Sequence, residues 1–323
     1  HSDWAGGYRR FNAELEQGYT IITGTNQGIH AEVEPHPTKL ILRATLSDGT
    51  HKGPFELPME RDALLTEAEK GGFFSYAAGV AYQVLTHYRV RGIEIDNYLT
   101  DLPIQKGLSS SAAICVLVAR AFNRIYDLKM TIRGEMEYAY MGEITTPSRC
   151  GRMDQGCAFG NRPIMMIFDG ERIHVRELSV PRDLYFVIVD LNATKDTKEI
   201  LSRLNDCYPF AENDLERGVQ KYLGPINREI SHKAEEALRI GDAEEVGSLM
   251  EKAQSEFDRY LKPACPSQLT APVLHKVLDY GPIQQYILGG KGVGSQGDGT
   301  AQFIVKDEES QQKVIEIIER DLQ

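Results

Sequence analysis

A strongly patterned helix that follows a hydroxyl-rich segment constrains this chain more than any other feature. Its apolar residues recur with the spacing i, i+3, i+4, i+7, i+8 and i+11, at Ile114, Leu117, Val118, Ala121, Phe122 and Ile125. That spacing places them on one face of an α-helix, and we expect that face to be buried. The helix must begin near Ser109, Ser110 and Ser111, shortly after Gly107.

The residues before this helix indicate a phosphate-binding site. The segment Pro103–Ala113 carries a glycine and three serines directly before the helix. Backbone N–H groups at a helix start attract phosphate, and serine hydroxyls can hold phosphate oxygens or a magnesium ion. An ordinary serine-capped helix is the alternative, but the glycine and the length of the segment favour phosphate. The Gly-Lys-Ser/Thr ending of a Walker loop is missing, which argues against a common P-loop.

Composition narrows the class of protein. A length of 323 residues favours two domains. A net charge of -11 argues against a nucleic-acid partner, and an anionic ligand would need a local basic pocket. Five widely spaced cysteines indicate neither a disulfide framework nor a zinc site. We find no leader segment and no apolar run near the roughly 18 residues that a membrane helix needs, so we expect a cytoplasmic protein.

Patterning along the chain predicts an α+β fold. Runs rich in β-branched and apolar residues predict strands at 19–22, 39–46, 163–168, 172–175, 185–190 and 301–305. We expect the first two strands to belong to an antiparallel region. Apolar spacing predicts further helices at 73–87, 131–143, 197–261, 271–280 and around 314–318. We also expect a threonine cap at Thr131, a glycine-rich turn at 289–299 and a domain boundary near Val180.

Five segments together resemble one enzyme family. The segment Pro103–Ala113 resembles the second motif of the galactokinase, homoserine kinase, mevalonate kinase and phosphomevalonate kinase (GHMP) superfamily, in its galactokinase-like variant. Four other segments are similar to galactokinase motifs in the same order: His1–Gly7, Phe73–Val80, Cys150–Gln155 and Gly289–Gly299. The resemblance spans essentially the whole chain. It implies the two-domain GHMP kinase fold, with an N-terminal ribosomal-protein-S5-like domain over residues 1–180 and a C-terminal ferredoxin-like domain over residues 181–323.

The resemblance also assigns expected roles. It implies a sugar-1-kinase related to galactokinase, which uses ATP and magnesium (Mg²⁺) to phosphorylate a hydroxyl of a sugar or sugar-like molecule. The residues expected to bind ATP are Gly107, Ser109, Ser110 and Ser111, with Phe73 and Tyr76 near the adenine. The expected metal ligands are Ser111 and Glu143. The residues expected to bind the substrate are His1, Asp3, Asp154, Gly292 and Gly294.

Asp154 is also the expected catalytic residue. It matches the family aspartate beside the acceptor hydroxyl, where a carboxylate can orient the hydroxyl or take its proton. The glycine-rich segment offers residues that can adopt positive φ and approach a ligand closely. Thr197 falls where relatives place a residue near the active site, and helix capping accounts for it equally well.

Three departures from the family leave the substrate open. The strand that ends in Pro-Gly-Arg or Pro-Gly-Lys is not present, so we expect the natural first strand to be missing from the sequence given. Arg9–Gly18 resembles an insertion, and Gln296 and Asp298 interrupt a segment that galactokinases fill with glycine and alanine.

Two alternatives therefore remain. A mevalonate-type kinase usually carries Pro-Ser-Gly-x-Asp where this chain has Cys-Gly-Arg-Met-Asp, and a non-catalytic sugar and ATP sensor tends to lose the serines of the second motif. The expected partners are a small sugar-like substrate and ATP, with no nucleic acid and no membrane, and the protein is expected to be a monomer or a homodimer.

Overall fold

The computed structural model describes residues 1–102, 110–148 and 150–322. Contacts divide the chain into a continuous unit, Ile22–Arg162, and a discontinuous unit built from His1–Ile21 and Pro163–Gln323. The boundary expected from the sequence, between residues 180 and 181, separates the two domains of the family fold and not these two units, and it stays a prediction. Both units mix helices and sheets, in agreement with the expected α+β class.

A four-stranded sheet forms one layer of the continuous unit. Its strands are β2 (Ile29–His36), β5 (Gly92–Thr100), β3 (Lys39–Thr45) and β4 (His51–Pro58), in the order β2-β5-β3-β4. The β2–β5 and β3–β4 pairs are antiparallel, but β3 and β5 run parallel, which corrects the expectation of a purely antiparallel region. The parallel pair is possible because β4 and two helices lie between β3 and β5 in the chain and supply the long crossover.

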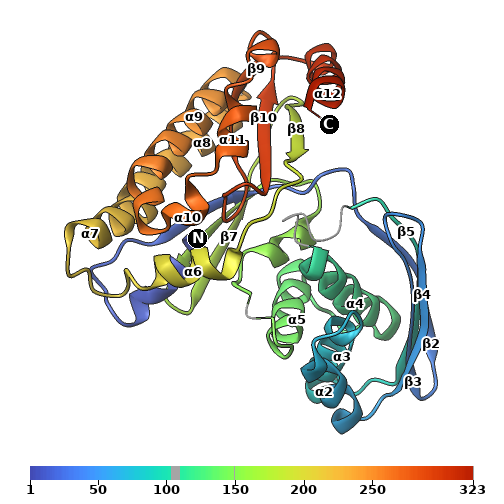
Figure 1. The fold of residues 1–323 in the computed structure, drawn as a ribbon. Coiled ribbons are helices and arrows are strands. Elements are labelled where there is room, and N and C mark those ends of the chain that lie inside the picture. Colours follow the sequence, from blue (N-terminus) through green and yellow to red (C-terminus); the bar gives the residue numbers. More distant parts are fainter. Residues whose placement is uncertain (103–109, 149, 323) are drawn as a thin grey trace. The chain divides into compact units, whose positions relative to one another are not determined.

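Helices form the other layer of this unit. They are α2 (Arg61–Lys70), α3 (Ser75–His87), α4 (Ser110–Tyr126), α5 (Ile132–Ile144) and the 3₁₀ helix η2 (Asp154–Phe159). In Figure 1, α2 to α5 lie on one side of the four-stranded sheet. The fully buried side chains of Leu40, Leu42, Ile93 and Ile95 supply the sheet's share of the core.

The strongly patterned helix is confirmed as α4, but it is buried more widely than predicted. Ala112, Cys115, Val116 and Ala119 are buried beside the predicted Phe122, whereas the predicted Ile114, Leu117 and Ile125 are only half-buried. The reason is that α4 packs against α3, α5, η2 and the strands β2 and β5, so several sides are covered. The threonine cap is also confirmed, since Thr131 Oγ1 accepts a 3.3 Å hydrogen bond from the Gly134 N–H.

Helices α3 and α5 cross at two glycines. A Cβ atom added at Gly79 would lie 2.3 Å from the Gly142 carbonyl oxygen, and one added at Gly142 would lie 2.6 Å from Val80 Cα. Only hydrogen fits at either position, so the backbones of the two helices touch. This crossing fixes the end of α5, where Glu143 lies.

The discontinuous unit contains two sheets. The first has the order β1-β6-β7, from β1 (Gly18–Ile22), β6 (Ile164–Asp169) and β7 (Arg172–Glu177), and α1 (Ser2–Gly7) packs on it. The second is antiparallel with the order β8-β10-β9, from β8 (Tyr185–Asp190), β10 (Thr300–Val305) and β9 (Ile287–Gly292). The expected strands are therefore present, with ends that differ by a few residues.

The remaining helices also belong to this unit. The long helical region expected at 197–261 is several helices, because turns and a π-helical segment interrupt it: α6 (Thr197–Asn205), α7 (Asp214–Lys221), η3 (Tyr222–Ile226), α8 (Asn227–Ile240) and α9 (Ala243–Tyr260). The other longer helices are α11 (Pro272–Leu278) and α12 (Glu308–Leu322). Short helical segments complete the unit: η1 (Tyr8–Arg10), η4 (Lys262–Ala264), α10 (Pro266–Leu269) and η5 (Gly281–Ile283).

The glycine-rich segment is only partly a turn, which corrects the prediction. Gly289 to Gly292 lie in β9, and the positive φ values fall later, at Gly294, Gln296 and Gly297. A Cβ atom at Gly289 would lie 2.2 Å from the Gly247 carbonyl oxygen of α9. The first glycines therefore let a helix backbone lie directly against a strand.

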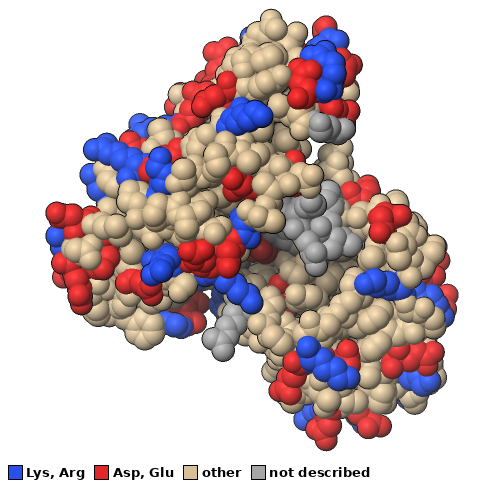
Figure 2. All heavy atoms as spheres, in the orientation of Figure 1, with Lys and Arg blue, Asp and Glu red and all other residues tan. Residues whose placement is uncertain are grey.

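Within the described ranges no helix has the length and apolar character needed to cross a membrane. All five cysteines are free thiols, as the sequence predicted. Acidic and basic side chains are interspersed over the face that Figure 2 shows.

Candidate functional site

A buried carboxylate lies where the continuous unit joins α5 to η2. Glu143, one residue before the end of α5, is 1% exposed. Its Oε2 atom accepts a 2.8 Å hydrogen bond from Gln155 Nε2 of η2. Since η2 begins at Asp154, this bond holds the predicted metal ligand next to the segment that carries the predicted catalytic residue.

The pKa values of nearby thiols place both carboxylates in one neighbourhood. Burial raises the pKa of Cys157 to about 12, and the negative charges of Asp154 and Glu143 contribute to the rise. Burial also raises the pKa of Cys150 well above its usual range, with Glu143 as the next cause. Both thiols therefore stay protonated at neutral pH and are poor nucleophiles.

The start of α4 faces the same neighbourhood. Ser110 is the first residue of α4, and both it and Ser111 are half-buried. Cys115 lies one helical turn after Ser111, and the pKa of its thiol is raised first by burial and then by the charge of Glu143. Helix α4 also packs against both α5 and η2. The predicted ATP-binding residues Gly107 and Ser109 lie outside the described residues.

The two aromatic residues predicted near adenine have different partners. Burial raises the pKa of Tyr76, a hydrogen bond with Ser148 lowers it, and the charge of Glu143 raises it. Phe73 is 38% exposed, and its ring lies edge-on to Phe74 at 4.9 Å. Lys52 Nζ lies 4.8 Å from the centre of the same ring.

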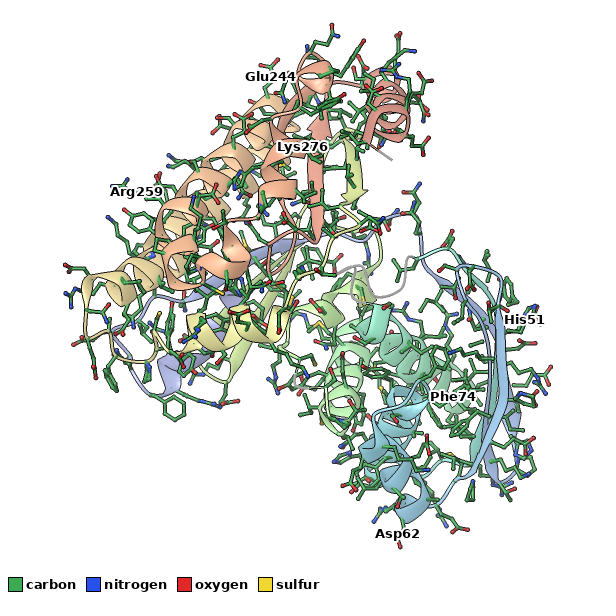
Figure 3. The ribbon with its side chains drawn as sticks, viewed as in Figure 1. His51, Asp62, Phe74, Glu244, Arg259 and Lys276 are labelled. Carbon is green, nitrogen blue, oxygen red and sulfur yellow. The ribbon has the colours of Figure 1, made fainter. Side chains whose placement is uncertain are left out.

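Phe74 is a packing residue. Its ring stacks on Phe55 of β4 with a centroid distance of 4.3 Å, and Figure 3 shows it between the helices and the sheet.

The Glu143 carboxylate and nearby oxygen donors suit Mg²⁺, with water and substrate phosphates as its remaining ligands. Within the described ranges, no Lys, Arg or His lies within ion-pair distance of Glu143, and the buried Gln155 Oε1 has no hydrogen-bond partner. Hard oxygen donors of this kind are what Mg²⁺ prefers. No group of three or more His, Cys, Asp or Glu side chains in the described part of the chain could hold a metal ion alone. Mg²⁺ usually completes its shell with water and substrate phosphates, so the residues present fit it.

Two predicted substrate residues lie in and beside α1 of the discontinuous unit. The His1 ring stacks on Phe257 at 6.2 Å, and Trp4 Nε1 donates a 3.4 Å hydrogen bond to His1 Nδ1. His1 Nε2 is buried without a partner among the described residues. Asp3 lies half-buried in the first turn of α1.

The other two predicted substrate residues lie in the glycine-rich segment of the same unit. The Gly292 N–H donates a 2.8 Å hydrogen bond to Gln254 Oε1, and a Cβ atom at Gly292 would approach Gln296 Oε1 to 3.0 Å. Gln296 Oε1 is buried and has no partner within the described ranges. Gly294 has φ +61° and open space where a side chain would be.

Sequence reasoning assigned no role to two lysines, Lys291 within this segment and Lys195 beside it. Lys195 Nζ donates a 3.0 Å hydrogen bond to Ser295 Oγ, and Lys291 Nζ donates a 2.6 Å bond to the Gly292 carbonyl oxygen. Burial lowers the pKa of both, that of Lys291 to about 8. No spacing pattern in the sequence marks them. In the structure, a Cβ atom at Gly299 would lie 2.7 Å from Lys195 Nζ, so this glycine makes room for the Lys195 side chain.

Two further expectations can be compared with local structure. Asp196, not Thr197, caps α6, since its Oδ1 accepts a 3.0 Å hydrogen bond from the Glu199 N–H. The segment Arg9–Gly18 is attached to the first sheet by a 2.6 Å ion pair between Arg9 and Asp169. Its expected position beside a substrate pocket stays a prediction.

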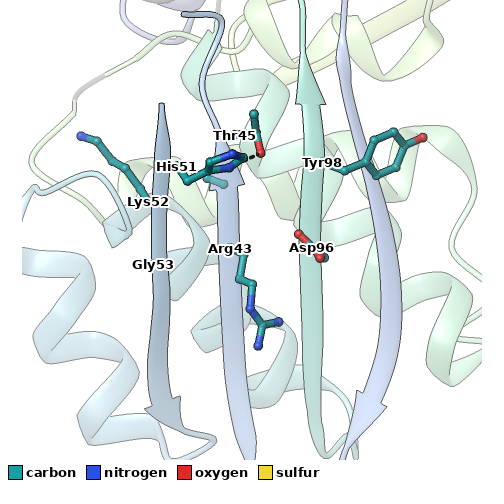
Figure 4. A pocket seen from close by; sticks show the side chains of 8 residues that line it. Arg43, Thr45, His51, Lys52, Gly53, Asp96 and Tyr98 are labelled. Carbon is teal, nitrogen blue, oxygen red and sulfur yellow. Dashed lines mark hydrogen bonds between the residues drawn. The ribbon is translucent and has the colours of Figure 1, made fainter. Parts of the chain in front are cut away.

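A separate hollow of about 360 Å³ lies on the four-stranded sheet. Arg43, Asp96 and Tyr98 line it, together with His51, whose Nδ1 lies 3.0 Å from Thr45 Oγ1 (Figure 4). The residues that line it include none of the predicted site residues.

Comparison with known families identifies the region around Glu143. The family described as GHMP kinases N terminal domain matches residues 75–161, a range that contains Ser110, Ser111, Glu143 and Asp154. Residues 75–161 are a GHMP kinase N-terminal domain, and the galactokinase relatives support the GHMP superfamily for the chain. GHMP kinases use ATP as the phosphate donor, and this domain match indicates a kinase activity.

Curated relatives support the galactokinase-like branch of the GHMP kinases. It is 27% identical to the galactokinase of Thermococcus kodakarensis over 283 residues, which cover 79% of this chain and 76% of that protein. It is 23% identical to the galactokinase of Pyrococcus furiosus over 224 residues, which cover 61% of this chain and 62% of the relative.

Solved structures of GHMP kinases share the fold. The structure of Lactococcus lactis galactokinase complexed with galactose has a TM-score of 0.71 at 16% identity, covering 99% of this chain and 86% of that one. The structure of L. major mevalonate kinase in complex with R-mevalonate has a TM-score of 0.66 at 17% identity, covering 94% and 86%.

Proposed function

We propose that this protein transfers the γ-phosphoryl group of ATP to a hydroxyl of a sugar or sugar-like molecule, as a sugar-1-kinase related to galactokinase. One observation supports the proposal above the others: the Glu143–Gln155 hydrogen bond joins the buried carboxylate to the segment that begins with Asp154. A carboxylate for the metal and a carboxylate for the acceptor are the two acidic groups that this reaction needs.

Asp154 is proposed to act on the acceptor hydroxyl. Its carboxylate would orient the hydroxyl and take its proton as the oxygen bonds to the γ-phosphorus and the bond to the bridging oxygen of ADP breaks. The transition state is loose, so the main contribution of Asp154 is positioning.

The ATP side of the reaction is assigned to α4 and its surroundings. The N–H groups and hydroxyls at Ser110 and Ser111, with Gly107 and Ser109 before them, are proposed to hold the phosphates. Glu143 and Ser111 would hold Mg²⁺, which when bound neutralises phosphate charge. Phe73 and Tyr76 are proposed to contact adenine.

The acceptor is proposed to be a neutral or weakly acidic sugar. The proposed substrate residues are His1, Asp3, Asp154, Gly292 and Gly294. Carboxylates accept hydrogen bonds from pairs of sugar hydroxyls, which suits a polyol better than an isoprenoid acid. ATP consumption should therefore be screened against hexoses, pentoses, uronic acids, cyclitols and mevalonate. Activity on mevalonate with none on any sugar would contradict the assignment.

The substitution Asp154→Asn tests the catalytic role. We expect turnover of the best sugar to fall by about 10² to 10⁴, with ATP affinity nearly unchanged. The exposed Asp62 in the first turn of α2 offers a matched control, because Asp62→Asn removes the same charge from the same unit. Near-normal turnover in Asp154→Asn would remove the residue from the mechanism. ATP binding with no turnover on any acceptor by the unaltered protein would favour a sensor instead.

A further inference from the structure

Helix α9 lies along strand β9 and contacts it at two places (Figure 1). At the first, the backbones touch, because a Cβ atom added at Gly247 would lie 2.2 Å from the Leu288 carbonyl oxygen. At the second, Gln254 Oε1 accepts a 2.8 Å hydrogen bond from the Gly292 N–H. The helix rises about 10 Å from Gly247 to Gln254, and the strand covers about the same length from Gly289 to Gly292. Gln254 therefore lies opposite the last residue of β9.

The Gly292 N–H group depends on this side chain for a partner. Among the described strands, β9 lies at the edge of its sheet, so alternate N–H groups of β9 point away from β10. The next N–H group, that of Val293, donates a 2.9 Å hydrogen bond to the Thr300 carbonyl oxygen of β10. The Gly292 N–H therefore points outward, toward α9. Gly292 is buried, and a buried N–H group without an acceptor is costly.

Gln254 is held from its other side as well. Its Nε2 atom donates a 3.1 Å hydrogen bond to Asp258 Oδ1, one turn further along α9. The same carboxylate oxygen lies 3.4 Å from His275 Nε2 of α11. A backbone N–H can only donate and an ionised carboxylate can only accept, so the two partners fix the orientation of the amide.

Helix α11 also holds the far end of the glycine-rich segment. The N–H of Leu274, next to His275, donates a 2.8 Å hydrogen bond to Asp298 Oδ1. The segment is thus attached to α9 at Gly292 and to α11 at Asp298. Between these points Gly294 is exposed, with φ +61° and open space where a side chain would be.

We propose that Gln254 is a positioning residue, which holds Gly292 and Gly294 in place for the acceptor, with Asp258 and His275 keeping its amide in orientation. The inference rests on the proposed function, in which the two glycines contact the acceptor. Among the buried residues of α9, which the structure describes in full, Gln254 alone is polar. An apolar side chain would fill the same space, so we infer that the amide is present for its hydrogen bonds.

The substitution Gln254→Met tests the proposal, because methionine has a similar length but makes neither hydrogen bond. We expect the KM for the best sugar to rise by about tenfold, as for the loss of one buried hydrogen bond. The KM for ATP should not change, since ATP binding is assigned to α4. Gln220→Met is the matched control, because Gln220 Nε2 donates a 2.7 Å hydrogen bond to the Cys207 carbonyl oxygen in the same unit. An unchanged sugar KM in Gln254→Met, or an equal rise in both KM values, would overturn the proposal.

An exchange of the two side chains separates hydrogen bonding from packing. In the double variant Gln254→Glu with Asp258→Asn, the new carboxylate can accept from the Gly292 N–H and from the new amide. The sugar KM should return close to that of the unaltered protein. A KM as high as that of Gln254→Met would count against the hydrogen bonds as the cause. Circular dichroism shows whether each variant folds, and Asp258→Ala supplies a further variant, in which the sugar KM should also rise.

Hydrogen exchange gives a readout that does not need turnover. The peptide that contains residues 289–299 should exchange faster in Gln254→Met than in Gln220→Met, because the Gly292 N–H has lost its acceptor. Equal exchange in the two variants would refute the inference even if the protein phosphorylates a sugar. Absence of turnover on any acceptor by the unaltered protein would instead contradict the proposed function, and hydrogen exchange would still decide whether Gln254 holds the segment.

Discussion

Replacing Gly142 with alanine should loosen the crossing of α3 and α5 and disturb Glu143 next to it. A Cβ atom there would lie 2.4 Å from Val80 Cγ2, 2.6 Å from Val80 Cα and 2.7 Å from Val80 N. Two of these three atoms are backbone and cannot rotate away, so the helices must move apart. Overpacking of this kind costs about 3 kcal/mol at the upper end of its usual range.

Helix propensity offsets part of that cost. Alanine is favoured over glycine in a helix by about 1 kcal/mol, which leaves a net loss of about 2 kcal/mol in the free energy of unfolding. Gly134→Ala is a matched control in the same helix, because its Cβ atom would lie 3.2 Å from the Met130 side chain and not against backbone. That variant should be between neutral and about 1 kcal/mol more stable than the unaltered protein.

The assay must report on the continuous unit. The single tryptophan, Trp4, lies in the other unit, so urea unfolding should be followed by far-ultraviolet circular dichroism instead of tryptophan fluorescence. A parallel measurement of kcat/KM should show a loss in Gly142→Ala that Gly134→Ala does not share, because Gly142 directly precedes Glu143. Equal stability of Gly142→Ala and the unaltered protein would refute the close-crossing argument.

Two further predictions follow from burial and capping. The pKa of Lys291 is about 8 in the folded protein and 10.5 for an ordinary lysine, so the unfolded state binds more protons between these values and stability should rise from pH 8 to 10.5. Lys291→Met should remove that rise and stabilise the protein at pH 7 by up to about 3 kcal/mol. Melting temperatures of the variant and the unaltered protein, measured from pH 7 to 10.5, check this prediction. Curves of melting temperature against pH that run parallel for the two proteins would contradict it. Thr131→Ala should lower the free energy of unfolding by about 1 kcal/mol through loss of the α5 cap, whereas Thr131→Ser should retain the cap. Urea titration measures the free energy of unfolding of both variants. An equal loss in the two variants would exclude the cap as the cause.

Local patterns in the sequence predicted individual elements well. The spacing around Phe122 identified α4, and Thr131 was found in its predicted capping role. Both signals are local, because helix periodicity and capping depend on residues only a few positions apart. The buried sides of α4 were harder to predict, since they depend on which helices and strands surround it.

Long-range features were the main errors. The parallel pairing of β3 with β5 depends on a crossover, which strand composition does not encode. The glycines at 289–292 indicated a turn from composition alone, whereas in the structure Gly289 lies against Gly247 and Gly290 against Phe303, both distant in the chain.

The candidate site was predicted in outline through motif resemblance. That resemblance singled out Glu143 and Asp154, and the structure adds the Gln155 hydrogen bond and the Tyr76–Ser148 contact around them. The roles of these residues stay predictions. Lys195 and Lys291, which are half-buried, could not be found from spacing, because their surroundings are set by the tertiary structure, as in the packing of Gly299 against Lys195.

The split of the discontinuous unit imposes an order on folding during synthesis. Strand β1 pairs with β6, and these two strands lie on opposite sides of the whole continuous unit in the chain. Residues 1–21 leave the ribosome before the continuous unit but cannot complete their sheet until residues after 163 emerge. The continuous unit can fold in that interval and bring the ends at 22 and 162 together, as the 3.0 Å hydrogen bond from the Gly24 N–H to the Gly160 carbonyl oxygen indicates. Early folding of residues 22–162 would thus shorten the effective loop that β1 and β6 must close.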